Sequence, residues 1–253
     1  MQVLVSRTKV SPTVWPLLVC RCNGAAAPAL CCRHAAGMLA AVPHDNPMPQ
    51  VASTPDALMV RDPEAAYAQL RAQWPREQAC WVFGYASLIW RPEFQASERR
   101  SALLHGWHRA FRMRSRVNRG SPQAPGLVFA LLSGGACRGF VYRLRPETLE
   151  HELQQLWARE MPTGVYDARV LPCRTAAGTV PALAFTLPRS SPACLHRLSD
   201  DELLQTLRHA QGRYGSTLDY LLQTAQALHQ EGVRDREIER QVALARRHGL
   251  LHR

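Results

Sequence analysis

The sequence contains almost no lysine. Lysine and arginine together account for 31 of the 253 residues, yet Lys9 is the only lysine, so arginine carries nearly all of the basic charge behind the net charge of +11. Such a bias is more typical of genome composition than of a surface selected to bind nucleic acid. Anionic small molecules would be attracted equally well, and we predict no nucleic-acid partner.

Long hydrophobic runs are also missing. No uninterrupted apolar segment approaches the roughly 20 residues that a membrane-spanning helix needs. The composition, with 46% hydrophobic and 20% charged residues, is that of a globular protein. We therefore predict no membrane segment and a sizeable buried core.

The eight cysteines lack the spacing of a disulfide framework or a metal site. Four of them, at positions 80, 137, 173 and 194, occur singly, as expected for reduced thiols in the cytosol. The other four lie close to His34 without the paired two-residue gaps of a zinc site. We predict a cytoplasmic protein that holds no metal.

The N-terminal segment differs from the rest of the chain. Its apolar stretch, residues 14–19, is short and contains Pro16, which argues against a signal peptide. We expect residues 1–54 to be a disordered leader or the product of a wrongly assigned start codon. Residues 55–253 are expected to form a single domain with a helical C-terminal part.

The remaining pattern predicts strands first, one helix inserted among them, and helices last. Predicted strands cover 79–83, 101–113, 126–132, 138–144, 168–174 and 179–187, with Gly134-Gly135 as a hairpin signal. Predicted helices cover 62–74, 146–160, 200–213, 217–230 and 235–248, and Ser199 with Glu202 forms a capping-box pattern. This order predicts an α+β fold whose sheet is closed or strongly curled.

Glu160 is the most informative residue of the chain. In a helix beginning at Pro146, it falls roughly 20° from Leu149 and so lies within the apolar stripe, and Pro162 and Gly164 then end the helix. Burial and the negative end of the helix would both raise the pKa of this carboxyl group, which suits a proton shuttle. Periodicity alone favours the alternative, a last-turn glutamate that turns to water or pairs with Arg159.

A second candidate is the turn of small residues from Gly84 to Ser87, directly after a buried strand. Its backbone N–H groups could bind a carboxylate or a developing oxyanion. Ser87 is a poor candidate for a nucleophile, because no glycine follows it as in a nucleophile elbow.

Arginines alternate at positions 112, 114 and 116 and would share one face of a strand. This face is either simply solvated, or it steers an acidic substrate or contacts a phosphate backbone.

Several ordered segments resemble the ChaC-type γ-glutamylcyclotransferases. They are Trp81–Trp90 (WVFGYASLIW), Gly106–Phe111 (GWHRAF), Arg119–Gly126 (RGSPQAPG), Gly139–Leu144 (GFVYRL), Trp157–Tyr166 (WAREMPTGVY) and Gly215–Leu221 (GSTLDYL). The resemblance implies a small barrel of mixed β-sheet with flanking and C-terminal helices, characteristic of γ-glutamylcyclotransferases. It also implies a cytosolic lyase that converts glutathione to 5-oxoproline and Cys-Gly without a metal or cofactor.

The resemblance further implies roles for particular residues. Glu160 would be the general base and acid, and Tyr166 would contact the substrate. Further substrate-binding residues would come from one segment, comprising Val82, Phe83, Gly84, Tyr85, Ala86, Ser87 and Leu88. Ala86 departs from the family, which has glycine there, so a positive φ at this position would strain the backbone and cast doubt on substrate affinity. A broader γ-glutamyl specificity, a non-catalytic γ-glutamyl-binding relative and an arginine-rich nucleic-acid binder are the alternatives.

Overall fold

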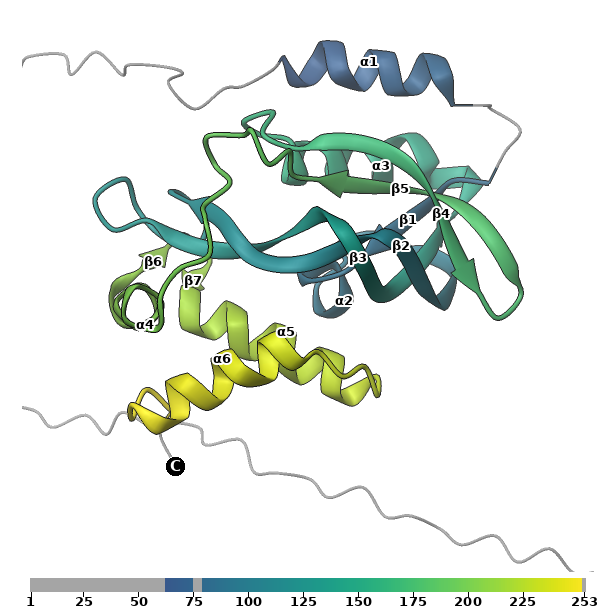
Figure 1. Cartoon of the computed structure of the whole chain (residues 1–253). Coiled ribbons are helices and arrows are strands. Elements are labelled where there is room, and N and C mark those ends of the chain that lie inside the picture. The colour runs from purple at the N-terminus through teal and green to yellow at the C-terminus, as the bar shows by residue number, and fades with distance from the viewer. Residues whose placement is uncertain (1–61, 75–78, 252–253) are drawn as a thin grey trace, which may run out of the picture. The chain divides into compact units, whose positions relative to one another are not determined.

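The computed structural model describes residues 62–74 and 79–251, and Figure 1 shows their arrangement. The leader predicted over residues 1–54 lies outside the described residues. Within the described part, a closed β-barrel forms the centre, and helices pack around it (Figure 1). This is the α+β fold with a closed sheet that the order of elements predicts.

Five strands form the barrel: β1 (Trp81–Gly84), β2 (Ala96–Ser115), β3 (Gly126–Leu144), β4 (Asp167–Thr175) and β5 (Gly178–Thr186). Neighbours follow the order β1-β3-β2-β4-β5 and are antiparallel, while β5 closes the barrel through parallel pairing with β1. The sheet is therefore mixed as well as closed.

The predicted hairpin at Gly134-Gly135 is wrong. These glycines have φ of +99° and +73°, yet they lie inside the single long strand β3, which pairs with β2 along its whole length. The register shifts where they face Gly106, itself at φ +81°. Left-handed glycines here bend the two-stranded ribbon as a bulge instead of reversing the chain.

The helices are α1 (Pro63–Gln73), the short α2 (Ser87–Trp90), α3 (Leu149–Glu160), α4 (Asp200–His209), α5 (Thr217–Gln230) and α6 (Arg236–Arg247). A 3-10 turn, η1 (Pro146–Thr148), precedes α3, and two-residue strands β6 (Gln211–Gly212) and β7 (Gly215–Ser216) separate α4 from α5. Figure 1 shows α4, α5 and α6 gathered on one side of the barrel, with α3 on the other.

Local sequence signals explain most helix boundaries. Ser199 and Glu202 form the predicted capping box at α4, and Ser216 with Asp219 forms another at α5. The prediction that the first of these helices runs to residue 213 is wrong, because α4 ends at His209. The next residues pair as β6 and β7 around Gly215, at φ +103°, and a helix cannot include that conformation.

Strand β1 has buried side chains on both of its faces. Val82 packs in the cluster that contains Leu153 and Leu156 of α3, whereas Phe83 packs in the cluster that contains Tyr220 of α5. Both strand residues are fully buried, at 0% exposure. Each such side chain contributes about 1.5–3 kcal/mol through burial. The strand is thus fixed between two cores, and the turn after it is held in a defined place.

Within residues 62–74 and 79–251, no helix combines the length and apolar character needed to cross a membrane.

Candidate active site

Glu160 is the last residue of α3 and marks the end of its buried face. Leu153 and Leu156 are buried, as the predicted stripe requires, and the Glu160 side chain is 16% exposed. The helix stops because Met161 is its C-cap and Gly164 takes φ +60°, which confirms the predicted end of this helix. The carboxylate is therefore held on a rigid element where helix and loop meet.

The surroundings of Glu160 favour its protonated form. Burial raises the pKa of the Glu160 carboxyl group, Arg159 lowers it to a smaller extent, and Glu93 raises it again. The Arg159 Nε lies 3.1 Å from Glu160 Oε1, so this glutamate pairs with its neighbour and is still largely buried. The sequence left open whether Glu160 is buried or pairs with Arg159, and in the structure it does both.

Arg159 also connects α3 to the α2 region. Its guanidinium donates to Ser87 Oγ at 3.1 Å, to Glu93 Oε2 at 2.9 Å and to the Arg91 carbonyl oxygen at 2.6 Å. Ser87 therefore accepts from a cation and has the wrong surroundings for an activated nucleophile. The main effect of Arg159 is to fix the position of α2 relative to Glu160.

Glu160 lines a cavity of about 470 Å³. Tyr85, Ala86, Ser87, Leu88 and Tyr166, all predicted to bind substrate, line it too. The remaining predicted residues, Val82, Phe83 and Gly84, lie in β1, paired with β3, and are not among the lining residues. They support the turn, and an added Cβ at Gly84 would lie 2.9 Å from the Tyr142 ring.

The turn after β1 continues directly into α2. Ala86 is the N-cap residue at φ −143°, so alanine adopts this position without the strain of a positive φ. The first N–H groups of any helix lack partners within it, which leaves those of Ser87 and Leu88 beside the cavity as donors. The departure from the family's glycine therefore does not place alanine at a positive φ.

Three buried tyrosines surround Glu160. Burial above all, and to a smaller extent the negative charge of Glu160, raise the pKa values of Tyr85, Tyr166 and Tyr220, the last to about 12. Tyr85 Oη donates to the Phe185 carbonyl oxygen at 3.2 Å. All three phenols consequently stay protonated near neutral pH and can act as hydrogen-bond donors or as walls of the cavity.

The three arginines predicted to share one face, at positions 112, 114 and 116, do not all line the cavity. Arg114 and Arg116 line the cavity, whereas Arg112 donates to the Leu195 carbonyl oxygen at 2.7 Å. The register shift between Phe111 and Met113 explains the split, because a bulge changes which side chains share a face. Arg112 therefore has a structural contact, and the other two remain available to a ligand.

No group of three or more His, Cys, Asp or Glu residues that could hold a metal ion occurs in the described part of the chain. The cysteines of that part, Cys80, Cys137, Cys173 and Cys194, are free thiols.

Comparison with known proteins places this geometry in a family. The model of the ChaC-like protein family matches residues 80–248. The glutathione-specific gamma-glutamylcyclotransferase of Escherichia coli is 37% identical over 172 residues, which are 68% of this chain and 74% of that protein. Human glutathione-specific gamma-glutamylcyclotransferase 1 is 32% identical over 163 residues, 61% of this chain and 73% of the relative.

A crystal structure of a yeast gamma-glutamyl cyclotransferase specific to glutathione superimposes with a TM-score of 0.62 at 20% identity. It covers 70% of this chain and all of the yeast chain. The barrel therefore has the γ-glutamylcyclotransferase fold, with an acidic residue at its cavity. Within that class, this chain belongs to the ChaC-like protein family.

The sequence alone did not identify four residues of the site. Arg119, Phe185 and Tyr220 line the cavity, and Arg159 positions α2. Two of the three lining residues fall within motifs that resemble the family, Arg119 in the segment 119–126 and Tyr220 in the segment 215–221. Phe185 carries no such signal, because it reads as an ordinary buried strand residue.

Proposed function

We propose that this protein is a glutathione-specific γ-glutamylcyclotransferase, which releases 5-oxoproline and Cys-Gly. The observation that carries the proposal is the largely buried Glu160 carboxylate, with its raised pKa, on a cavity lined by the first turn of α2. The names of the bacterial and human relatives support the choice of glutathione. A cytoplasmic location fits the free thiols of the described residues.

The reaction needs no nucleophile from the protein. Glu160 accepts a proton from the substrate's α-ammonium group, and the resulting amine nitrogen bonds to the γ-carbonyl carbon. The leaving nitrogen takes that proton back from Glu160 as the bond from the carbon to the cysteine nitrogen breaks. The attacking nitrogen then loses its second proton, which passes through Glu160 to the released amine, so that Cys-Gly leaves with an ammonium group. Holding the γ-glutamyl chain folded brings amine and carbonyl together, an effect that accelerates intramolecular reactions strongly.

Charge that develops on the γ-carbonyl oxygen requires fixed donors. The N–H groups of Ser87 and Leu88 and the protonated hydroxyl of Tyr166 lie at the cavity and supply them without reorganisation. Removing one such donor typically lowers kcat by about 10²- to 10³-fold.

The pH profile should report Glu160. Only its carboxylate form accepts the proton, so kcat/KM should fall as the pH drops through its raised pKa, at a pH above 4.5, the ordinary value for glutamate. Arg159→Met should move this acid limb to higher pH, because Arg159 lowers the pKa of Glu160. An acid limb at or below 4.5, or one that Arg159→Met leaves in place, would contradict the assignment of Glu160 as the base.

The function is tested by product identification. Purified protein incubated with glutathione, without added metal and with a chelator present, should release 5-oxoproline and Cys-Gly in equal amounts. With γ-glutamyl-alanine in place of glutathione, 5-oxoproline should not appear. Turnover of both compounds would replace the glutathione-specific activity with a broader γ-glutamyl one. Release from neither would favour a non-catalytic binding protein.

A further inference from the structure

The cavity has an uneven distribution of charge. Its lining contains two carboxylates, Glu93 and Glu160, and both are paired with Arg159. On the side formed by the end of β2 and the loop after it, the lining contains the arginines Arg114, Arg116 and Arg119. This side has no lining carboxylate, so it would attract the carboxylate end of a ligand.

Arg119 is unusual because it is almost entirely buried without a hydrogen-bond partner. It is 6% exposed, and its guanidinium lies over Tyr220 at 5.2 Å and over Trp90 at 5.8 Å. No hydrogen bond or ion pair of this guanidinium occurs within residues 62–74 and 79–251. Asp219 acts on it electrostatically, but the Asp219 carboxylate accepts from the Ser216 N–H at 3.2 Å. A desolvated cation in this position is suited to a carboxylate ligand.

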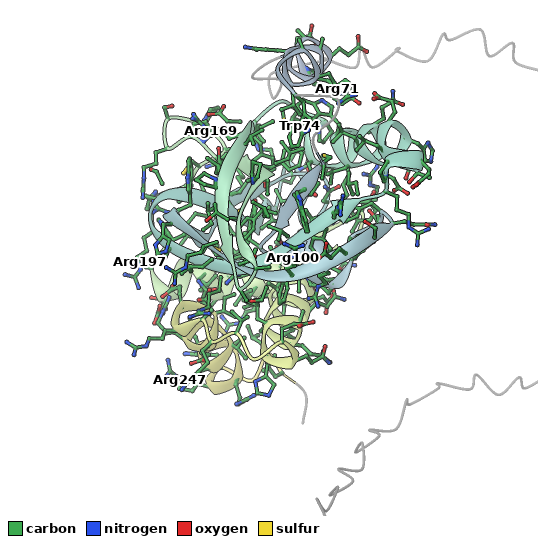
Figure 2. All side chains as sticks on the ribbon, turned by 90° about the vertical axis from the view of Figure 1, so that its right-hand side faces the viewer. Arg71, Trp74, Arg100, Arg169, Arg197 and Arg247 are labelled. Atoms are coloured by element: carbon green, nitrogen blue, oxygen red, sulfur yellow. The ribbon has the colours of Figure 1, made fainter. Side chains whose placement is uncertain are left out.

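Arg116 provides a second, independent observation. Its Nε atom is buried and has no hydrogen-bond partner, and its side chain lines the same cavity. Surface arginines of this protein look different. Arg197 projects from the surface in Figure 2, and its side chain is 73% exposed beside Glu237. A buried donor without a partner is costly unless a ligand supplies an acceptor.

We propose that Arg116 and Arg119 bind the C-terminal glycine carboxylate of glutathione, on the side of the cavity formed by the loop after β2. This inference rests on the proposed function and adds the feature that selects the substrate. A γ-glutamyl amine or an amidated peptide lacks the anionic end and leaves both guanidinium groups without a partner. Selectivity for the free tripeptide then comes from the end of the substrate that does not react.

The test compares glutathione with its glycine amide, in which a carboxamide replaces the distal carboxylate. Wild-type protein should prefer glutathione in kcat/KM by about 10- to 100-fold, the usual value of a charged hydrogen bond. In Arg119→Met this preference should fall by about an order of magnitude, through a higher KM for glutathione, with Arg116 still in place and the amide turned over as before. Arg116→Gln should reduce the preference in the same direction.

Arg197→Gln is the matched control, because it removes one positive charge that does not line this cavity and should leave the preference unchanged. If Arg119→Met does not fold, as judged by thermal melting, Arg116→Gln and Arg119→Lys carry the test. Equal wild-type turnover of both compounds, or equal loss of both in the variants, would overturn the assignment and leave these arginines a structural role. Wild-type turnover of neither compound would instead overturn the proposed function itself.

Discussion

Glu160→Gln is expected to fold normally and to turn over glutathione about 10²- to 10⁴-fold more slowly than the wild-type protein. This is the usual contribution of a general acid–base group. The amide keeps the size and shape of the carboxyl group but cannot accept the substrate's proton. Initial rates of 5-oxoproline release, measured with the two proteins at saturating glutathione, give the ratio directly. A variant that retains more than a tenth of wild-type activity would remove Glu160 from the mechanism.

The stability of the same variant has a predictable sign. A carboxyl group whose pKa is raised by folding contributes stability at low pH, and that contribution is lost as the pH rises through the raised value. Above the raised pKa the wild-type protein therefore bears the cost of a buried charge, and there Glu160→Gln should melt at an equal or higher temperature. Glu147→Gln, which changes an exposed glutamate just before α3, is the control and should alter neither activity nor melting.

Gly126→Ala should strongly lower the stability of the protein. A Cβ at this position would lie 2.0 Å from the Arg119 carbonyl oxygen and 2.3 Å from Thr217 Oγ1. Thr217 Oγ1 itself donates to that carbonyl at 2.8 Å and accepts from the Leu127 N–H at 3.2 Å, so the backbone cannot move without breaking both hydrogen bonds. We expect a loss of about 3 kcal/mol or more in the free energy of unfolding, measured by denaturant titration.

Gly134→Ala in the same strand provides the comparison. Gly134 has φ +99° but no heavy atom within 4 Å of an added Cβ. Its substitution should cost only about 1 kcal/mol, from backbone conformation alone. If both variants lose equal stability, close packing between the start of β3 and the Arg119 loop is not what fixes this part of the site.

The sequence could predict the parts of the site that depend on local periodicity. Glu160 falls on the buried stripe of its helix because Leu149, Leu153 and Leu156 set that face, and Pro162 and Gly164 end the helix where the pattern indicates. The glycine pair of β3 misled the prediction, since positive φ serves a bulge as well as a turn. A bulge is distinguished from a turn only by the pairing partner, because β2 runs continuously beside β3 on both sides of the glycine pair.

The carboxylate-binding side of the cavity could not be predicted in this way. Arg119 owes its position to Trp90 and Tyr220, which come from α2 and α5 and approach it only in the folded barrel. Alternation along β2 predicted one shared arginine face, but the bulge near Phe111 separates Arg112 from the other two. These contacts are long-range in sequence, so no local pattern carries them.

The measurement that tests the mechanism most directly uses glutathione whose α-amine is acetylated, mixed in equal amounts with free glutathione. If the substrate's own amine is the nucleophile, Cys-Gly should be released only from the free form, with one 5-oxoproline for each Cys-Gly. Release of Cys-Gly from the acetylated form, or the appearance of glutamate in place of 5-oxoproline, would contradict the intramolecular attack and indicate hydrolysis by water.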